Sequence, residues 1–197
     1  MKITKEDLLL EHPFANVSIK HVKSNTGIVH KHLLLQKKDA VCLTMFDIHT
    51  ETLLFVEQWR AGAQFNQDLN SDGITLEPVA GHIDDGENPI QAAIREALEE
   101  TTILIKEEDI TFIAKGLTSS GVSNEIHYHY FATFDSSKLD MNSILNKIHG
   151  VDDEEIKIKM LTIYDAMNMV SDGTIFASHS IIGIMHSFIN HVNQQPF

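Results

Sequence analysis

Hydrophobic and polar residues alternate along the first part of the chain, as they do in β-strands with one buried face. Two alternating runs, residues 14–22 and 27–37, lie on either side of the polar stretch "SNTG". This combination is typical of a β-hairpin. We therefore expect residues 1–38 to form a small N-terminal antiparallel β segment.

Longer apolar runs begin at Ala40 and predict the main domain, residues 39–197. The runs "AVCLTMF" and "TLLFVEQW" are typical of buried strands, and the polar stretch "DIHTE" between them is typical of a turn. Further strands and helices follow, which favours the α/β (α+β) class, a sandwich with a mixed sheet between helices. The later strands are expected at residues 110–116, 125–134 and 156–163, and two C-terminal helices at 164–171 and 175–192.

A further helix is expected in the second half of the stretch "GHIDDGENPIQAAIREALEETT", residues 81–102. Asn88 suits the N-cap position, where its side chain can accept backbone N–H bonds, and Pro89 suits the first helical position. Apolar residues then recur with the 3.6-residue period of a helix that buries one side. They are Ile90, Ala93, Ile94 and Ala97.

The composition fits a globular chain with an acidic surface. Among 197 residues, 28 Asp and Glu outnumber 15 Lys and Arg, which gives a formal charge of −13. Such a charge disfavours nucleic acid and anionic membranes as partners, and no run of 18 apolar residues predicts a membrane span. Cys42 is the single cysteine, which favours a reducing compartment, so we expect a cytoplasmic protein. An anionic ligand would need a cation to mediate its binding.

Glu96, Glu99 and Glu100 crowd the last turn of the predicted helix, where the helix dipole disfavours negative charge. Their spacing places the three carboxylates on one face. One interpretation is a solvated acidic face, with Arg95 bracing Glu99 and within reach of Glu87. The other is a binding site for a hard divalent cation, which takes oxygen ligands.

The residues upstream favour the cation. Six positions spaced over 20 residues match the Nudix box, so the sequence resembles a Nudix hydrolase. The resemblance implies a Nudix α/β/α sandwich and a loop–helix–loop that binds Mg²⁺ or Mn²⁺. Thr102 stands where the box has Gly, so we expect a costlier left-handed cap or another exit from the helix. The six matching positions are Gly81, Glu87, Arg95, Glu96, Glu99 and Glu100.

Other stretches extend the resemblance to bacterial ADP-ribose pyrophosphatases, among them "LEPVAGHIDDGE", "SSGVSNE" and "DGTIFASHSIIGIMHSF". This resemblance implies hydrolysis of ADP-ribose to AMP and ribose 5-phosphate by a homodimer that exchanges its N-terminal β segments. One alternative is the same chemistry on another nucleoside diphosphate sugar, such as GDP-mannose. Another is a non-catalytic sensor of ADP-ribose, which the intact glutamates and the absence of a basic recognition helix disfavour.

The resemblance also implies a role for individual acidic residues. The loop "GVDDEE" would supply the general base, Asp153 or with nearly equal weight Glu154, although a solvated acidic turn is the alternative. The expected metal ligands are the Ala80 carbonyl and the carboxylates of Glu96, Glu99, Glu100 and Glu154.

Substrate contacts are implied in three further regions. Lys37 and His32 replace arginines of the related proteins, and only a protonated His32 would keep the charge. For Arg60, a surface ion pair with Glu57 is an equally weighted alternative. In the loop "SSGVSNE", Ser and Val replace Pro and Gly of the related loop. The full set is His32, Lys37, Arg60, His82, Ser119, Ser120, Gly121 and Glu125.

Overall fold

The computed structural model describes residues 1–69, 71–151 and 154–194. The chain divides into two compact units. The first contains Met1–Ala40 and Lys115–His127, and the second contains Val41–Ala114 and Tyr128–Phe197. The functional division that the sequence predicts at residue 38 stays a prediction.

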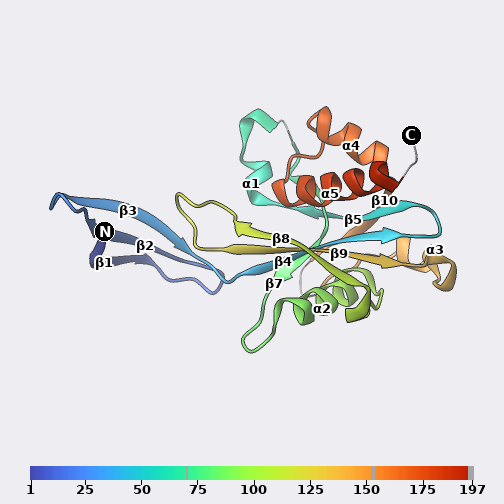
Figure 1. Ribbon diagram of the computed structural model, residues 1–197, viewed down its shortest axis with the longest axis horizontal. Helices are drawn as coiled ribbons and strands as arrows, with labels where there is room; N and C mark the ends of the chain where they lie inside the picture. Colours follow the sequence, from blue (N-terminus) through green and yellow to red (C-terminus); the bar gives the residue numbers. More distant parts are fainter. Residues whose placement is uncertain (70, 152–153, 195–197) are drawn as a thin grey trace. The chain divides into compact units, whose positions relative to one another are not determined.

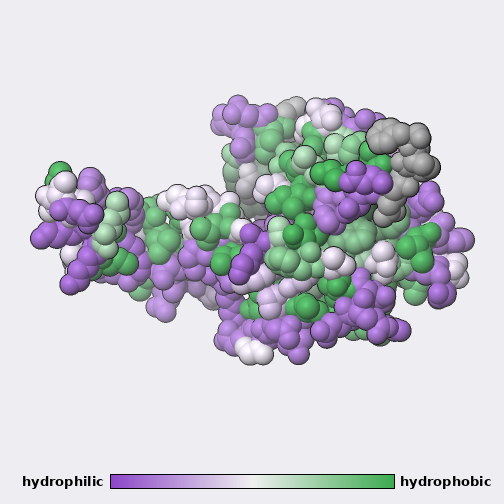
Figure 2. Space-filling view, in the orientation of Figure 1, coloured by the Kyte–Doolittle hydropathy of each residue, from purple (hydrophilic) through white to green (hydrophobic). Residues whose placement is uncertain are grey.

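Three antiparallel strands form the first unit: β1 (Lys2–Leu10), β2 (Asn16–Lys23) and β3 (Val29–Gln36) (Figure 1). The predicted hairpin is confirmed, and Gly27 takes the positive φ of 87° that its turn requires. Strand β1 lies within the predicted β segment, but it was not located as a strand, because its sequence "KITKEDLLL" lacks a clean alternation. Hydrophobic side chains lie exposed among polar ones on this sheet (Figure 2).

A seven-stranded mixed sheet organises the second unit, as the sequence predicted. Its strands run in the order β10-β5-β4-β9-β8, with β6 paired to β5 and β7 paired to β4. Pro78 separates the short strands β6 and β7, because proline donates no backbone hydrogen bond. The strands are β4 (Ala40–Asp47), β5 (Thr52–Trp59), β6 (Ile74–Glu77), β7 (Val79–His82), β8 (Ile110–Leu117), β9 (Ile126–Phe134) and β10 (Lys157–Thr162).

Helices cover both faces of this sheet. Helix α2 (Pro89–Thr101) lies on one face, and α4 (Ile163–Ser171) and α5 (Ser178–Gln194) lie on the other (Figure 1). Helix α5 begins three residues later than predicted. The shorter elements are α1 (Ala61–Gln64), α3 (Met141–Leu145) and 3-10 turns at Gln67–Leu69, Glu107–Asp109 and Ser136–Lys138.

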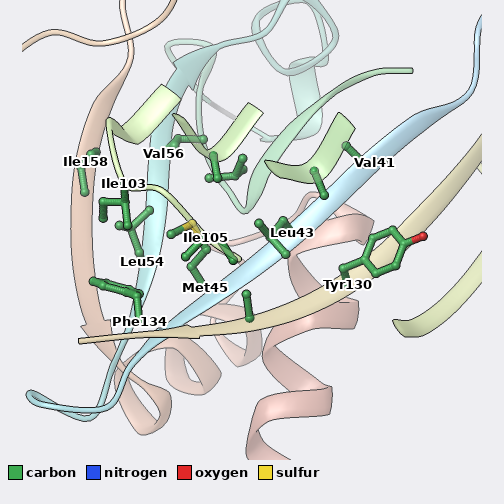
Figure 3. Close-up of a cluster of buried hydrophobic side chains, with 14 of the residues drawn as sticks. Val41, Leu43, Met45, Leu54, Val56, Ile103, Ile105, Tyr130, Phe134 and Ile158 are labelled. Carbon is green, nitrogen blue, oxygen red and sulfur yellow. The ribbon is translucent and has the colours of Figure 1, made fainter. Parts of the chain in front are cut away.

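Strand β5 contributes side chains to the hydrophobic cores on both faces of the sheet. Leu54 and Val56 belong to the hydrophobic core under α2, and the alternate residues Leu53 and Phe55 belong to the core under α4 and α5. Figure 3 shows the first core, in which Leu43 and its neighbours pack beneath the helix. A strand buried on both faces has a continuous apolar sequence, so the predicted α/β/α sandwich is confirmed. Within the described ranges, no helix is both long and apolar enough to cross a membrane.

Candidate active site

Helix α2 begins with the capping arrangement that its sequence predicted. The Asn88 side chain accepts hydrogen bonds from the backbone N–H groups of Ile90 and Gln91, both at 3.0 Å. The Gln91 side chain in turn accepts one from the Asn88 N–H. This reciprocal capping box, followed by Pro89, fixes where the helix starts and therefore where its last turn lies.

Two carboxylates of the last turn are buried. Glu96 and Glu100 are only 9% and 3% exposed, so a solvated acidic face does not describe them. The neighbouring strand β7 approaches them closely at its backbone. A Cβ added to Gly81 would overlap the Glu96 carboxylate, and the Glu100 carboxylate accepts a hydrogen bond from the Ala80 N–H at 3.2 Å. The box glycine is therefore required by this close approach.

Arg95 connects the loop before α2 to the acidic face. Its guanidinium donates to both oxygens of Glu87 at 3.0–3.1 Å, to Glu96 at 2.7 Å and to Glu99 at 3.0 Å. It also donates to the His82 carbonyl at 2.9 Å. The expected contacts with Glu99 and Glu87 are confirmed, and they explain why the box needs an arginine, since only its planar fork offers five donors.

The electrostatics of the two buried carboxylates favour a cation. Burial raises the pKa of Glu96, and it raises the pKa of Glu100 well above its usual value. The charge of Glu96 adds to the effect at Glu100, and the charge of Glu154 acts on both in the same direction. Carboxylates that repel one another in a poorly solvated place are stabilised when a positive ion joins them.

The loop that carries Glu154 is closed by two backbone hydrogen bonds between His149 and Ile156, at 2.8 and 3.1 Å. Gly150 has a φ of +100°, and a Cβ there would lie 2.6 Å from the Glu154 Cβ. The Glu154 carboxylate accepts the Val151 N–H at 3.3 Å. Asp153, the predicted general base, lies outside the described residues. The described part of the loop thus presents Glu154 within electrostatic reach of Glu96 and Glu100.

These residues fit a hard divalent cation by their chemistry, because carboxylate and backbone oxygens are its preferred ligands. Within the described ranges, no three Asp, Glu, His or Cys side chains already converge as a metal-binding group. Glu96 accepts a hydrogen bond from Arg95, and Glu100 accepts one from the Ala80 N–H. The individual metal ligands stay predictions.

Arg60 pairs with a residue that the sequence did not single out. Its guanidinium contacts both oxygens of buried Glu77 at 2.7–3.2 Å. The alternative pairing with Glu57 is wrong, since Glu57 lies 3.8 Å from Lys159 on the adjacent strand. A charged residue inside the apolar run "ITLEPVA" was the available signal for Glu77. His179 Nε2 lies 3.2 Å from Glu77, and the sequence contained no signal for this contact.

In the first unit, two of the predicted substrate-binding residues contact each other. The Lys37 ammonium lies 2.5 Å from the buried Glu125 carboxylate, which also accepts the Thr118 hydroxyl at 3.1 Å. Although burial opposes it, hydrogen bonds from His127 and Lys37 lower the pKa of Glu125 to about 2. Glu125 is therefore a permanently charged acceptor.

The remaining residues of the predicted substrate set are more exposed. His32 lies exposed on β3, where it pairs in register with Lys20. Backbone bonds from Val122 and Ser123 to the Ser119 carbonyl form the turn that contains Ser120 and Gly121. His82 is half-buried in the second unit.

A cavity of about 520 Å³ lies in the second unit on the side of α5. Its lining includes Phe46, Phe131 and His186, together with polar residues of the last turns of α5. None of the predicted site residues lines it. The candidate active site is therefore defined by the carboxylate cluster and its arginines.

The sandwich and the buried carboxylates of α2 together form a site whose chemistry suits divalent cations. A family model described as the NUDIX domain matches residues 36–173, more than half of the chain. The chain therefore belongs to the NUDIX family, and the Nudix hydrolase predicted from the box is confirmed.

Alignments with named relatives cover most of the chain. The GDP-mannose pyrophosphatase of Klebsiella pneumoniae is 26% identical over 183 residues, which are 91% of this chain and 87% of the relative. The GDP-mannose pyrophosphatase of Pectobacterium atrosepticum is 28% identical over 192 residues, 95% and 93% of the two chains. The ADP-ribose pyrophosphatase of Haemophilus influenzae is 27% identical over 172 residues, 86% and 75%. Because these identities are so similar, they do not decide between GDP-mannose pyrophosphatase and ADP-ribose pyrophosphatase as the better match.

Proposed function

We propose that this Nudix hydrolase cleaves the diphosphate of a nucleoside diphosphate sugar, with ADP-ribose as the first candidate. Water adds to one phosphorus while the P–O–P linkage breaks, which yields AMP and ribose 5-phosphate. The observation that carries the proposal is the set of mutually interacting carboxylates Glu96, Glu100 and Glu154. The charges of Glu100 and Glu154 also act on Arg60. An arginine beside a cation-binding cluster suits a diphosphate, which needs positive charge on several oxygens.

The acidic residues divide into two roles in this proposal. Bound Mg²⁺ or Mn²⁺ would neutralise the diphosphate and lower the pKa of the attacking water. Glu154 or Asp153 takes the proton of that water, and Arg60 binds phosphate oxygens. The cations would be held by the Ala80 carbonyl and by Glu96, Glu99, Glu100 and Glu154.

We propose that the other residues predicted to contact the substrate are suited to it by their own surroundings. Glu125 is an ionised acceptor and suits a sugar hydroxyl. Lys37 supplies positive charge next to it. The backbone of the turn 119–121 offers N–H and C=O groups, and His32 and His82 offer ring nitrogens.

GDP-mannose is the second candidate, and it would give GMP and mannose 1-phosphate. Relatives named GDP-mannose pyrophosphatase support it, since they cover up to 95% of this chain. The exposed histidine at position 32 is compatible with it, because a neutral imidazole can accept as well as donate hydrogen bonds.

A substrate panel tests the proposal. The protein is incubated with ADP-ribose, GDP-mannose and ADP-glucose in Mg²⁺, in Mn²⁺ and in EDTA, and nucleoside monophosphates are quantified by chromatography. We expect release of AMP or GMP that stops in EDTA. Release that continues in EDTA, or no release from any substrate, would contradict the proposal. Tight binding of ADP-ribose without release would favour the sensor.

We also propose that the chain forms a homodimer through the first unit. Its strand β1 exposes more than half the surface of Ile3, Leu8, Leu9 and Leu10. A three-stranded sheet cannot bury such side chains by itself, and exposed apolar patches commonly mark interfaces.

A further inference from the structure

Arg60 is held along one edge of its guanidinium. Nε donates to Glu77 Oε1 at 3.2 Å and to Oε2 at 3.1 Å, and Nη2 donates to Oε2 at 2.7 Å. The other N–H groups of the planar fork point away from Glu77. The charges of Glu100 and Glu154 also act on the Arg60 guanidinium. The bonds to Glu77 therefore fix how the guanidinium is oriented with respect to these two carboxylates.

Glu77 is itself fixed from two sides. It is 2% exposed, and the Thr75 hydroxyl donates to its Oε1 at 2.7 Å. His179 of α5 approaches the other oxygen, with Nε2 at 3.2 Å from Oε2, although its N–H does not point straight at it. The next residue, Ser180, donates its hydroxyl to the Leu76 carbonyl at 2.9 Å and fastens the first turn of α5 to β6.

Burial by itself would raise the pKa of Glu77. The hydrogen bonds and charge of Arg60 and the close approach of the His179 ring outweigh that effect and lower it. The carboxylate is therefore ionised, and Arg60 and His179 approach it from different elements. The first turn of α5 adds the positive end of its helix dipole on the same side.

We propose that His179 is a positioning residue: it holds the Glu77 carboxylate, which in turn holds the Arg60 guanidinium in the orientation that meets the diphosphate. The C-terminal helix thereby takes part in substrate binding without contacting the substrate. The link to a diphosphate rests on the proposed function, whereas the link from His179 to Arg60 rests on the contacts alone.

The purely structural alternative is that His179 only fastens α5 to the sheet. Ser180 already provides a buried contact for that purpose, from the same turn to the same strand. The two interpretations differ in what they expect at Arg60. If His179 positions Arg60, removing His179 should change the hydrogen exchange of the Arg60 side chain. If His179 only fastens α5, removing it should lower the stability of the protein.

The arginine content of the chain permits a direct test. Arg60 and Arg95 are its two arginines, so the Nε–Hε region of a ¹⁵N NMR spectrum holds two signals, which Arg60→Lys assigns. In metal-free protein, His179→Ala should speed Hε exchange at Arg60 about tenfold, because a charge-assisted bond loses its support. Arg95, bonded to Glu87, is the internal reference and should not change. His191→Ala, at the other end of α5, is the matched control.

Kinetics with the substrate identified by the panel give the second measurement. His179→Ala should lower kcat/KM about tenfold in the wild-type background and less than twofold in an Arg60→Ala background, because it acts through Arg60. His179→Lys should restore most of the loss by returning an N–H donor to Glu77. Equal losses in both backgrounds would overturn the proposal.

The NMR measurement and the kinetic measurement test different claims, so one can fail without the other. If the wild-type protein cleaves no substrate of the panel, the proposed function is lost and the NMR experiment still decides whether His179 positions Arg60. Unchanged Arg60 exchange in folded His179→Ala would overturn the positioning role even in an active enzyme. If His179→Ala does not fold, His179→Leu, which fills the space of the ring without an N–H donor, carries the same comparison.

Discussion

At the scale of the residue, burial of Glu100 opposes the ionisation that the proposed cation binding requires. Its carboxylate is 3% exposed beside the charged Glu96, and both conditions raise its pKa. Glu100→Gln keeps an acceptor for the Ala80 N–H and removes the charge. We expect hydrolysis in Mg²⁺ to fall at least about 100-fold. Stability in EDTA, measured by urea unfolding, should stay unchanged or rise by up to about 1 kcal/mol.

Glu107→Gln is the matched control for this experiment, because Glu107 is an exposed glutamate that begins a 3-10 turn of the same unit. It should change neither hydrolysis nor stability. A large loss of stability in Glu100→Gln would show that Glu100 serves the fold, and the interpretation of α2 as a cation-binding helix would then lose its main support.

At the scale of the element, Asp47 ties the turn between β4 and β5 to the segment after β9. Its carboxylate accepts backbone N–H groups of His49 at 3.1 Å, Thr50 at 3.3 Å and Ser136 at 3.0 Å. Burial opposes ionisation, but the bonds from Ser136 and Thr50 lower the Asp47 pKa from 3.8 to about 2. The folded-state value lies below the unfolded one. Its contribution is therefore present above about pH 4 and is lost as the pH falls toward 2.

Asp47→Asn should cost about 2 kcal/mol at pH 7 by this linkage. The difference in unfolding free energy between the two proteins, measured with urea, should be clearly smaller at pH 3. Comparing the two proteins at each pH cancels the titration of all other carboxylates. A difference that is equal at both pH values would show that geometry and not charge stabilises this turn.

The end of α2 gives a second prediction at this scale. Thr102 takes a left-handed conformation, with φ 60° and ψ 14°, and donates its N–H to the Leu98 carbonyl at 2.9 Å. A β-branched residue is strained there, so Thr102→Gly should raise the unfolding free energy by about 1 kcal/mol. Hydrolysis should not change. Thr102→Ala is the control, since it keeps the strained φ. An equal gain in both variants would assign the effect to the side chain instead.

Local sequence patterns predicted most of the helices and strands. They did not predict contacts between segments that are distant in the sequence. Asn88 and Pro89 lie next to the helix that they start, so capping rules located it. The pair of Arg60 with Glu77 spans 17 residues of sequence, and His179 approaches Glu77 from another helix. Such contacts depend on how strands and helices pack, which no local periodicity specifies. The family resemblance pointed to Arg60, and only the fold showed what holds it.

At the scale of the whole molecule, the proposed homodimer can be tested at the surface of the first unit. Leu8 is 56% exposed on β1, next to two further exposed leucines. If this sheet pairs with a second copy, Leu8→Asp should weaken the dimer about 100-fold, because a charge buried without a partner is costly. Light scattering after size exclusion at micromolar concentration would then report the mass of one chain in place of two.

Leu104→Asp, at a leucine 68% exposed in the second unit, is the matched control and should remain dimeric. A wild-type protein that is monomeric at this concentration would contradict the proposed homodimer, and so would equal dissociation of both variants.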